Sequence, residues 1–508
     1  MTTLHLSDGV IKDEILVVGL AFKTPANKGQ GALVIESGDI ALDSKKLLAT
    51  LSDLGATGKT DEIIKIPGSA TKVLVFTGLG ENKSTFSDET LRRAAGAAAR
   101  ALAGNSSATF SLPAKKAATI SAIAEGALLG AYSFNKFRVD SKVNRQASLK
   151  SVTIYSALAK KAEAKEAIKS AAIIGEYTCL VRDLINTPPS HLTPDSFCKE
   201  IGDLVKKVGG TSVGLKVTVM NDAQLKSKGY GGITAVGQGS ANPPRLLQIS
   251  YTPVKVKAKK SYAYVGKGIT FDSGGLTLKP AAGMEAMKSD MSGAAAVCAA
   301  TIAIALLKIP VAIDCYAPLA ENMVSDNATR PSDIITMYGG KTIEVLNPDA
   351  EGRLVLGDAL VKAQENKNLD GIIDVATLTG GARVALGVRT TGLMGVGVGV
   401  NTLVEAANNS GEALWAMPLP KELRALLNSE TADMVNSKLG DPTGSMLVGG
   451  HFLKEFVGFH DREKKNQIDW AHLDIAGPAS NDGAPFGYTG KGASGVMLRT
   501  LVQVAKSL

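Results

Sequence analysis

Several residue types that define particular classes of protein are scarce in this sequence. Only four of the 508 residues are cysteines, and no two of them form a Cys-x-x-Cys pair. This low density excludes a disulfide framework and makes the cytoplasm the expected compartment. There are five histidines, and none stands in a His-Glu-x-x-His motif, which excludes the helical zinc-protease signature. A Walker A loop is also missing, so a P-loop nucleotide site is not expected.

Long apolar runs and an export signal are missing as well. The longest apolar candidate, residues 294–307, falls short of the roughly 18 uncharged residues that a membrane span requires. The first residues, MTTLHLSDGVIKDE, carry acidic side chains where an export signal would be basic and then apolar. We therefore expect neither a membrane span nor export.

The composition is that of a folded, globular protein. Hydrophobic residues make up 45% of the chain and charged residues 20%, so extensive disorder is not expected. The 54 glycines and the aromatic content of 5% suit an α/β protein with many tight loops. The formal net charge is +8, which leaves a nucleic-acid or nucleotide-binding role open, alongside or instead of catalysis.

The sequence predicts a smaller and a larger α/β domain. Residues 1–165 alternate strand-like runs with alanine-rich helical stretches and contain no cluster of potential catalytic groups. A linking helix and a proline-rich connection follow over residues 166–194, where Pro188, Pro189 and Pro194 stop a helix and force extended chain. Residues 195–508 form the predicted catalytic domain, with a mixed central sheet flanked by helices.

Apolar, β-rich runs in the larger domain predict a sheet that helices cover on both faces. Ligands of such sheets bind beyond the carboxyl ends of the strands, so functional side chains are expected there. The clearest helices are predicted near residues 292–307 and 352–364. The strands are predicted at residues 245–251, 261–265, 311–318, 371–376 and 472–475.

The first segment that is rich in chemical groups follows the strand that ends near Val265. Glycines on both sides of Lys267, and at positions 274 and 275, allow the backbone to turn sharply and approach a bound ion or substrate. Lys267, Asp272 and Lys279 are therefore expected on loops at a strand end. Asp290 stands at the start of the next predicted helix, where the helix dipole favours a carboxylate.

The second such segment is Asn-Pro-Asp-Ala-Glu-Gly-Arg at residues 347–353. Asp349, Glu351 and Arg353 are spaced by two, and residues so spaced share a face in an extended stretch but not on a helix. The next helix is predicted to start near residues 351–353. Both carboxylates then point into one crevice, with Arg353 beside them.

Together, Asp272, Asp290, Asp349 and Glu351 would give one site four negative charges. Close carboxylates raise one another's pKa, and two divalent cations would neutralise them. Oxygen ligands suit Mg, Mn, Co or Zn, so the carboxylates alone do not select the metal. Lys267 adds a nitrogen ligand once it loses its proton. Singly, these residues fit helix caps and surface ion pairs equally well, but the whole set favours a two-metal hydrolase. A two-metal phosphoesterase is the enzymatic alternative, although the site has no histidine and includes a lysine.

Both segments closely resemble the cytosolic leucine aminopeptidases, the M17 family of two-metal exopeptidases. The strings that match are VGKGITFDSGG at 265–275, NPDAEGRL at 347–354, and the spacing from Lys279 to Asp290. Shorter matches are ENM at 321–323, ATLTG at 376–380 and WAHLDIAG at 470–477. The resemblance covers residues 180–508 and is faint in the first domain.

The resemblance implies how the site binds metal. Lys267, Asp272, Asp290 and Glu351 would hold a tightly bound divalent ion, and Asp272, Asp349 and Glu351 an exchangeable one, the ions being Zn, Mn or Co. The same resemblance implies roles for residues outside the metal ligands. Lys279 would polarise the scissile carbonyl, and Arg353 would hold a bicarbonate as general base. The substrate would be bound by Met287, Thr377, Leu378, Gly380 and Ala476.

The resemblance also implies a homohexamer of peptidases that act on short peptides with a free N-terminus, with leucine and other apolar first residues preferred. The first domain would be a macro-like module that helps assembly. Two departures from the family pattern stand out. Pro348 replaces the commoner threonine and should be tolerated, because its side chain is no ligand. Pro478 and Ala479 stand where the family is often bulkier, which predicts a wider pocket for the first side chain.

Overall fold

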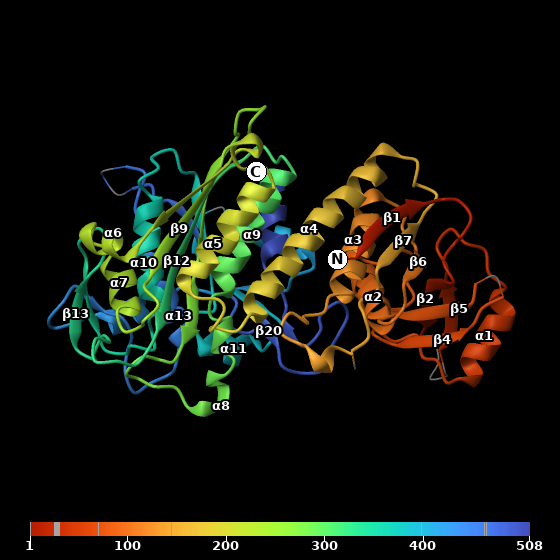
Figure 1. Cartoon of the computed structure of the whole chain (residues 1–508), viewed down its shortest axis with the longest axis horizontal. Coiled ribbons are helices and arrows are strands. Elements are labelled where there is room, and N and C mark those ends of the chain that lie inside the picture. Colours follow the sequence, from red (N-terminus) through yellow and green to blue (C-terminus); the bar gives the residue numbers. More distant parts are fainter. Residues whose placement is uncertain are drawn as a thin grey trace. The chain divides into compact units, whose positions relative to one another are not determined.

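The computed structural model describes residues 2–24, 31–69, 71–143, 145–397, 399–461, 463 and 465–508, and Figure 1 labels its elements. Its contacts divide the chain into two units. The first consists of Met1–Cys179 together with Asn481–Lys491, and the second of Leu180–Ser480 together with Gly492–Leu508. The division falls inside helix α4 (Ala162–Asn186). The two units are described separately below.

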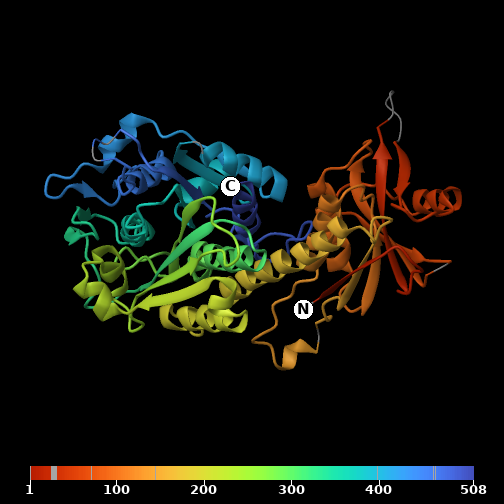
Figure 2. The same ribbon diagram turned by 90° about the horizontal axis from the view of Figure 1, so that it is seen from above.

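In the described part of the first unit, seven strands form a sheet in the order β1-β7-β6-β2-β5-β4, with β3 beside β2. The strands of this sheet are the red to orange arrows in Figure 2. Alternate residues of β2 point to opposite faces, as the pleat of a strand requires. Val17 joins the core beneath helices α2 and α3, whereas Leu16 and Val18 join the core beneath α1. The bounds are β1 (Thr3–Ser7), β2 (Ile15–Lys23), β3 (Ala32–Glu36), α1 (Ser44–Asp53), β4 (Ile63–Pro67), β5 (Val73–Glu81), α2 (Asp88–Ala101), β6 (Ser107–Ser111), α3 (Ala117–Gly130) and β7 (Ser151–Tyr155).

A short segment from near the end of the chain completes this first unit. The backbone N–H of Gly487 donates to Oδ1 of Asp61 at 2.6 Å, and the hydroxyl of Tyr488 donates to Oε1 of Glu89 at 3.0 Å. Gly96 of α2 allows the approach, because a Cβ at that position would overlap Tyr488. Residues 481–491 are therefore an integral part of the first unit.

The second unit is built on a mixed sheet, as predicted. Nine of its described strands have the order β17-β16-β19-β15-β10-β12-β9-β8, with β11 beside β12. Strands β19, β15, β10, β12 and β11 run parallel, while β9, β8 and β16 are antiparallel to their inner neighbours. The bounds are β8 (Leu215–Met220), β9 (Arg245–Tyr251), β10 (Ser261–Gly266), β11 (Gly268–Asp272), β12 (Ala312–Asn322), β15 (Gly371–Ala376), β16 (Thr391–Val396), β17 (Leu414–Ala416) and β19 (Asp469–Asp474).

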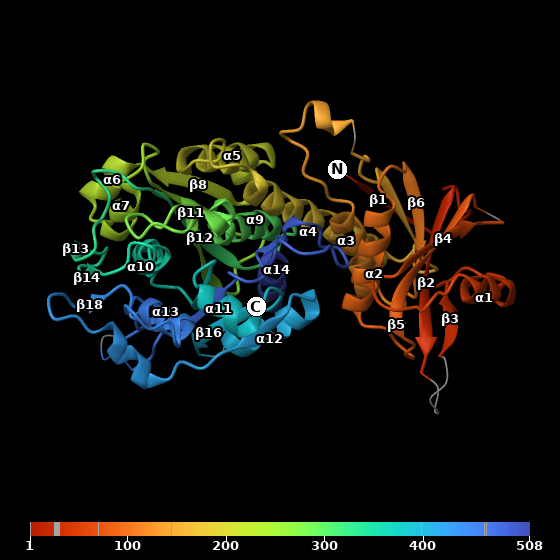
Figure 3. The ribbon, with the colours of Figure 1, turned by 90° about the horizontal axis from the view of Figure 1, so that it is seen from below.

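Helices cover both faces of this sheet, which confirms the predicted fold class. Helix α9 (Ser292–Leu306) packs on one face beside α14 (Leu498–Ser507), and the hydroxyl of Tyr264 donates to the carbonyl of Leu501 at 3.1 Å. Helix α10 (Gly352–Ala363) packs on the other face, so β12 lies between α9 and α10 (Figure 3). The remaining helices are α5 (Pro194–Lys207), α6 (Asp222–Ser227), α7 (Gly231–Gly237), α8 (Ala281–Met284), α11 (Gly380–Leu386), α12 (Gly399–Ser410) and α13 (Ser445–Lys454).

One apolar helical stretch is long enough to cross a membrane, although the sequence predicts no membrane span. Among the described residues, Ala281–Leu306 is long and apolar enough to cross a membrane by length and composition. However, 89% of its most apolar window is buried inside the protein. This burial is what a core helix such as α9 requires, because both of its sides contact protein.

The parallel strands bring their carboxyl ends to one edge of the sheet. Lys267 stands between β10 and β11, Asp272 ends β11 and Asn322 ends β12. Thr377 follows β15, and Asp474 ends β19. Polar side chains that are up to about two hundred residues apart in the sequence thus meet at the edge where ligands of such sheets bind.

Candidate active site

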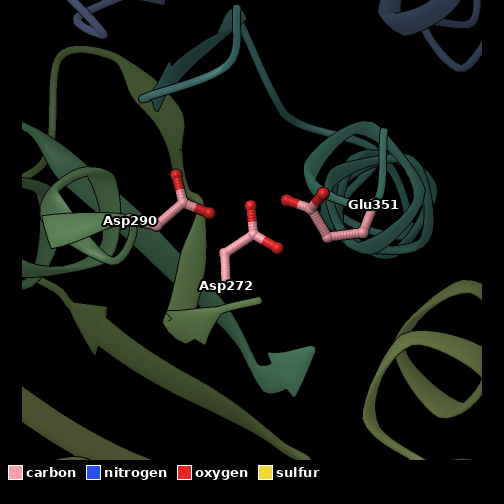
Figure 4. Close-up of side chains that lie close together, drawn as sticks. All are labelled: Asp272, Asp290 and Glu351. Carbon is pink, nitrogen blue, oxygen red and sulfur yellow. The ribbon is translucent and has the colours of Figure 1, made fainter. Parts of the chain in front are cut away.

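Three carboxylates form the centre of the candidate site. Asp272 lies at the end of β11, Asp290 follows the short helix η3 (Met287–Ser289), and Glu351 is the N-cap residue of α10. Figure 4 shows their carboxylates pointing toward one another, and all three side chains are buried. One oxygen from each lies within 4.8 Å of the others, a spacing that would allow them to hold a metal ion.

A buried lysine binds two of these carboxylates. Nζ of Lys267 lies 2.8 Å from Oδ2 of Asp290 and 2.8 Å from Oε1 of Glu351, and it donates to the carbonyl of Thr377 at 3.1 Å. Burial opposes the charge on this ammonium, but the surrounding carboxylates outweigh that effect and raise the pKa of Lys267. The ammonium of Lys267 thus places a positive charge among these carboxylates.

A second lysine pairs the remaining carboxylates in the same way. Nζ of Lys279 lies 2.8 Å from Oδ2 of Asp272 and contacts Oδ1 of Asp349. Burial opposes this charge too, and Asp272 is the first of the carboxylates that raise the pKa of Lys279 nevertheless. Two ammonium groups therefore lie among the four carboxylates.

Several oxygens of these carboxylates accept no hydrogen bond within the described part of the chain. Among the described residues, Oε2 of Glu351 has no hydrogen-bond partner, and Oδ2 of Asp290 and Oε1 of Glu351 meet only the ammonium of Lys267, without hydrogen-bond geometry. Burial raises the pKa of Asp290, Glu351 and Asp349. Unpartnered anionic oxygens in a buried site are costly. An oxygen-rich donor set of this kind fits a divalent cation.

Asn322 fixes the orientation of Asp272, and the sequence analysis assigned it no role. Its Nδ2 donates to Oδ1 of Asp272 at 2.9 Å and to the carbonyl of Pro348 at 3.2 Å. The backbone N–H of Gly274 donates to the same Oδ1 at 2.9 Å. These bonds occupy one oxygen of Asp272 and leave Oδ2 facing the cluster. The signal available in the sequence was a polar residue at the carboxyl end of a strand.

A second amide, Asn436, holds the loop that carries Asp349. Its Oδ1 accepts from the backbone of Leu346 at 2.9 Å and of Asn347 at 3.2 Å, and its Nδ2 donates to the carbonyls of Asn347 and Ala350. The side chain is fully buried. No local sequence pattern links Asn436 to this loop, because the two lie almost ninety residues apart.

Arg353 lies beside the cluster rather than in it. Its Nη1 donates to the carbonyl of Asn436 at 2.8 Å, and its guanidinium lies over the ring of Phe452, 5.9 Å from the centroid. Among the described residues its Nε has no partner. Burial lowers the pKa of Arg353 to about 10. A buried guanidinium with a free donor is a natural partner for an anion.

The predicted substrate-binding residues lie on neighbouring segments. Oγ1 of Thr377 donates to Oδ1 of Asp290 at 2.8 Å, which joins this residue directly to the cluster. The backbone N–H groups of Leu378 and Ala476 both donate to Asp474. Met287 lies in η3, and its carbonyl accepts from the backbone N–H of Asp290 at 3.2 Å, whereas Gly380 begins α11.

One competing motif in the sequence has the wrong structure for its chemistry. Residues 210–214, Gly-Thr-Ser-Val-Gly, fit the Gly-x-Ser-x-Gly pattern of serine hydrolases. That nucleophile requires a sharp turn from a strand into a helix. Here the segment is a 3-10 helix between α5 and β8, and Oγ of Ser212 donates to the carbonyl of Gly209 at 2.7 Å. It therefore gives no support to a serine nucleophile.

Comparison with known proteins identifies the family. Residues 179–502 match the cytosol aminopeptidase family, catalytic domain, and residues 11–141 match its N-terminal domain. A probable cytosol aminopeptidase of Streptomyces avermitilis is 48% identical over 525 residues, covering 100% of this chain and 98% of the relative. Another from Micrococcus luteus is 46% identical and covers 90% of this chain and 89% of the relative.

Solved structures agree with these sequence matches. A mutant of tomato leucine aminopeptidase superposes with a TM-score of 0.84 at 31% identity, covering 100% of this chain and 97% of the other. The bottromycin maturation enzyme BotP in complex with Mn superposes with a TM-score of 0.82 at 33% identity, covering 97% and 99%. The chain therefore belongs to the cytosol aminopeptidase family and is a hydrolase of the leucyl aminopeptidase class.

Proposed function

We propose that this chain is a two-metal aminopeptidase that removes leucine or another apolar first residue from short peptides with a free N-terminus. The observation that carries this proposal is the buried group of Asp272, Asp290 and Glu351, whose oxygens converge while three of them, on Asp290 and Glu351, lack hydrogen-bonded partners among the described residues. Zn, Mn or Co would suit these ligands. Mn gains support from the BotP structure, which is described as a complex with that ion.

The ligands divide into two overlapping sets. Lys267, Asp272, Asp290 and Glu351 would hold one ion, and Asp272, Asp349 and Glu351 the other. The ammonium of Lys267 must then release its proton, since only a neutral amine binds metal. A dication close to the amine favours that release by replacing the proton's charge.

The chain's own cations would act on the substrate. When bound, a pair of divalent cations lowers the pKa of a water molecule and stabilises the charge that develops on the carbonyl oxygen. Lys279 would give up Asp272 and Asp349 as partners and donate a hydrogen bond to the scissile carbonyl. Its partly exposed position, 19% for the side chain, leaves it room to do so.

Arg353 would hold a bicarbonate ion beside the reacting centre. The unpartnered Nε of this buried side chain supports an anion there. Bicarbonate would supply the general base. The role of Arg353 is to hold that anion by charge-assisted hydrogen bonds and to keep it close to Glu351 without binding metal itself.

The substrate would be held at its N-terminal end. Asp290 would accept the free α-amine, which explains why only first residues are removed. Leu378 would offer its carbonyl and Gly380 its amide to the peptide backbone, while Met287, Thr377 and Ala476 would line the pocket for the first side chain. We further propose that the protein works in the cytoplasm as a homohexamer, which the macro-like first domain helps to assemble. The names of the relatives support the compartment.

The decisive experiment measures hydrolysis of leucyl-aminomethylcoumarin after chelation, and then after addition of Zn, Mn or Co. An N-acetylated substrate serves as the control. Activity that returns with metal and requires the free amine is expected. No activity with any metal in a folded, assembled sample would refute the proposal and favour a binding role.

The division of roles has its own test in metal analysis. Asp272→Ala should lose metal, because both proposed ligand sets use this carboxylate. Lys279→Ala and Arg353→Ala should lower kcat while metal content stays near that of the unaltered protein. Equal metal loss in all three variants would show that the roles are wrongly divided.

A further inference from the structure

A buried carboxylate outside the metal cluster binds two segments of the proposed substrate pocket. Asp474 ends β19 and its side chain is fully buried. Its Oδ1 accepts from the backbone N–H of Leu378 at 3.3 Å and of Ala476 at 3.1 Å, and its Oδ2 accepts from Oγ1 of Thr379 at 2.7 Å. One side chain thus holds residues that are almost a hundred positions apart.

The segment over residues 377–379 is held from both ends. Oγ1 of Thr377 donates to Asp290 at 2.8 Å, which fixes the start of the segment to the carboxylate cluster. At its far end, Oγ1 of Thr379 also accepts from the backbone N–H of Ala382 at 3.1 Å and caps α11. Asp474 therefore connects the start of α11, residues 377–379 and the loop after β19.

We propose that Asp474 is a positioning residue that sets the first-residue preference of the enzyme by fixing both walls of the side-chain pocket. This inference rests on the proposed function, in which Thr377 and Ala476 line that pocket. No described hydrogen bond or ion pair joins Asp474 to Asp272, Asp290 or Glu351. Its loss should therefore disturb the pocket while the metal ligands keep their places.

The physical reason is that a buried carboxylate whose two oxygens both accept hydrogen bonds orders the donors that surround it. Hydrogen bonds to an ionised acceptor are about twice as strong as neutral ones, and they strengthen further in a water-poor site. Discrimination between apolar side chains depends on pocket contacts that each change the rate modestly. A pocket whose wall has become mobile therefore loses this discrimination easily.

The experiment compares Asp474→Ala and Asp474→Asn with a matched control, Asp358→Asn. Asp358 is also fully buried in the same unit, and it accepts from the backbone N–H of Ile233 at 2.9 Å and of Tyr338 at 2.8 Å. It stands two turns into α10 and has no proposed part in the site. Each metal-loaded variant is assayed on leucyl-, methionyl- and alanyl-aminomethylcoumarin, and its metal content is measured.

For Asp474→Ala we expect KM for the leucyl substrate to rise about ten-fold, with kcat changed less than about three-fold. The ratio of leucyl to alanyl kcat/KM should collapse toward about one, and metal content should not change. Asp474→Asn keeps one acceptor oxygen and should recover most of the ratio. Asp358→Asn should leave the ratio unchanged.

An unchanged ratio and KM in folded, metal-loaded Asp474→Ala would overturn the inference. If that variant does not fold, Thr379→Val and Thr379→Ser replace it, because only serine keeps the hydroxyl that Asp474 accepts from. The serine variant should then keep the ratio and the valine variant lose it.

Amide hydrogen exchange separates this inference from the proposed function. Protection of residues 377–382 and 475–477 should fall in Asp474→Ala, whatever the protein hydrolyses. Unchanged protection in these segments would overturn the inference. Absence of hydrolysis by the unaltered protein would refute the proposed function alone.

Discussion

The first residue of α10 has no room for a side chain, which gives a sharp test of how the carboxylate cluster is held. A Cβ at Gly352 would overlap Cε of Lys267 and lie 2.5 Å from its Nζ. The lysine cannot move aside easily, because its side chain is only 4% exposed and its ammonium is held by Asp290, Glu351 and Thr377. Gly352→Ala therefore forces either the lysine or the helix to move.

The two responses differ in cost. Displacing Lys267 would leave buried carboxylates unpaired, at about 3–5 kcal/mol. Shifting the start of α10 costs about 1–3 kcal/mol, the usual range for overpacking. The helix shift is cheaper, so we expect a loss of about 1–3 kcal/mol in unfolding free energy. Because Glu351 and Arg353 move with the helix start, metal affinity and activity should fall together.

The assay is thermal unfolding of the metal-free protein, together with metal content by mass spectrometry after loading. Gly202→Ala is the control, since this glycine lies inside α5 and a Cβ there meets nothing within 4 Å. Replacing a helical glycine by alanine where the new Cβ meets open space should stabilise the protein by about 0.5–1 kcal/mol. If Gly352→Ala unfolds and loads metal like the unaltered protein, Lys267 is not confined as we describe.

Three further predictions follow from single contacts. Asn322→Ala removes the donor that orients Asp272 and should weaken metal binding about ten-fold in a chelator competition, and an unchanged affinity would mean that the amide is dispensable. Arg353→Lys keeps the charge but loses the fork of donors, so kcat should drop while metal content holds, and wild-type kcat would argue against anion binding there. Burial raises the pKa of Asp358 from its usual 3.8 to about 7, so between these values the folded chain binds more protons than the unfolded chain. Stability relative to Asp358→Asn should therefore fall by roughly 4 kcal/mol as the pH rises from about 4 to 7, and stay level above that. If the difference in stability between the two proteins, measured by thermal unfolding, does not change with pH across this range, the raised pKa is contradicted.

Local patterns were enough to predict the elements that carry the site. The strand predicted at residues 245–251 is β9, and the helix predicted to start near residues 351–353 is α10, whose first residue is Gly352. Both follow from hydrophobic periodicity and chain breakers, which act over a few residues. The rule that polar groups gather beyond parallel strand ends is enough to predict Lys267 and Asp272 at one edge of the sheet.

The partners of each charge could not be predicted in the same way. Asn322 lies 50 residues from Asp272, and Asp474 lies 96 residues from Leu378. Such contacts depend on strand order, and strand order is set by packing of the whole sheet rather than by spacing along the chain. For the same reason, the sequence offered no sign that residues 481–491 return to the first unit.

That returning segment has a consequence for how the protein is made. The first 179 residues leave the ribosomal exit tunnel long before residue 491 has been synthesised. The nascent first unit therefore lacks residues 481–491, the strip that contacts Asp61 and Glu89. Domains generally fold as units, the N-terminal one first. Here the N-terminal unit cannot be completed first, because its last piece arrives only after the sheet of the second unit has been translated. A fragment ending at residue 179 would therefore lack the partners that Asp61 and Glu89 have in this strip, and a separate peptide of residues 481–491 should bind to it.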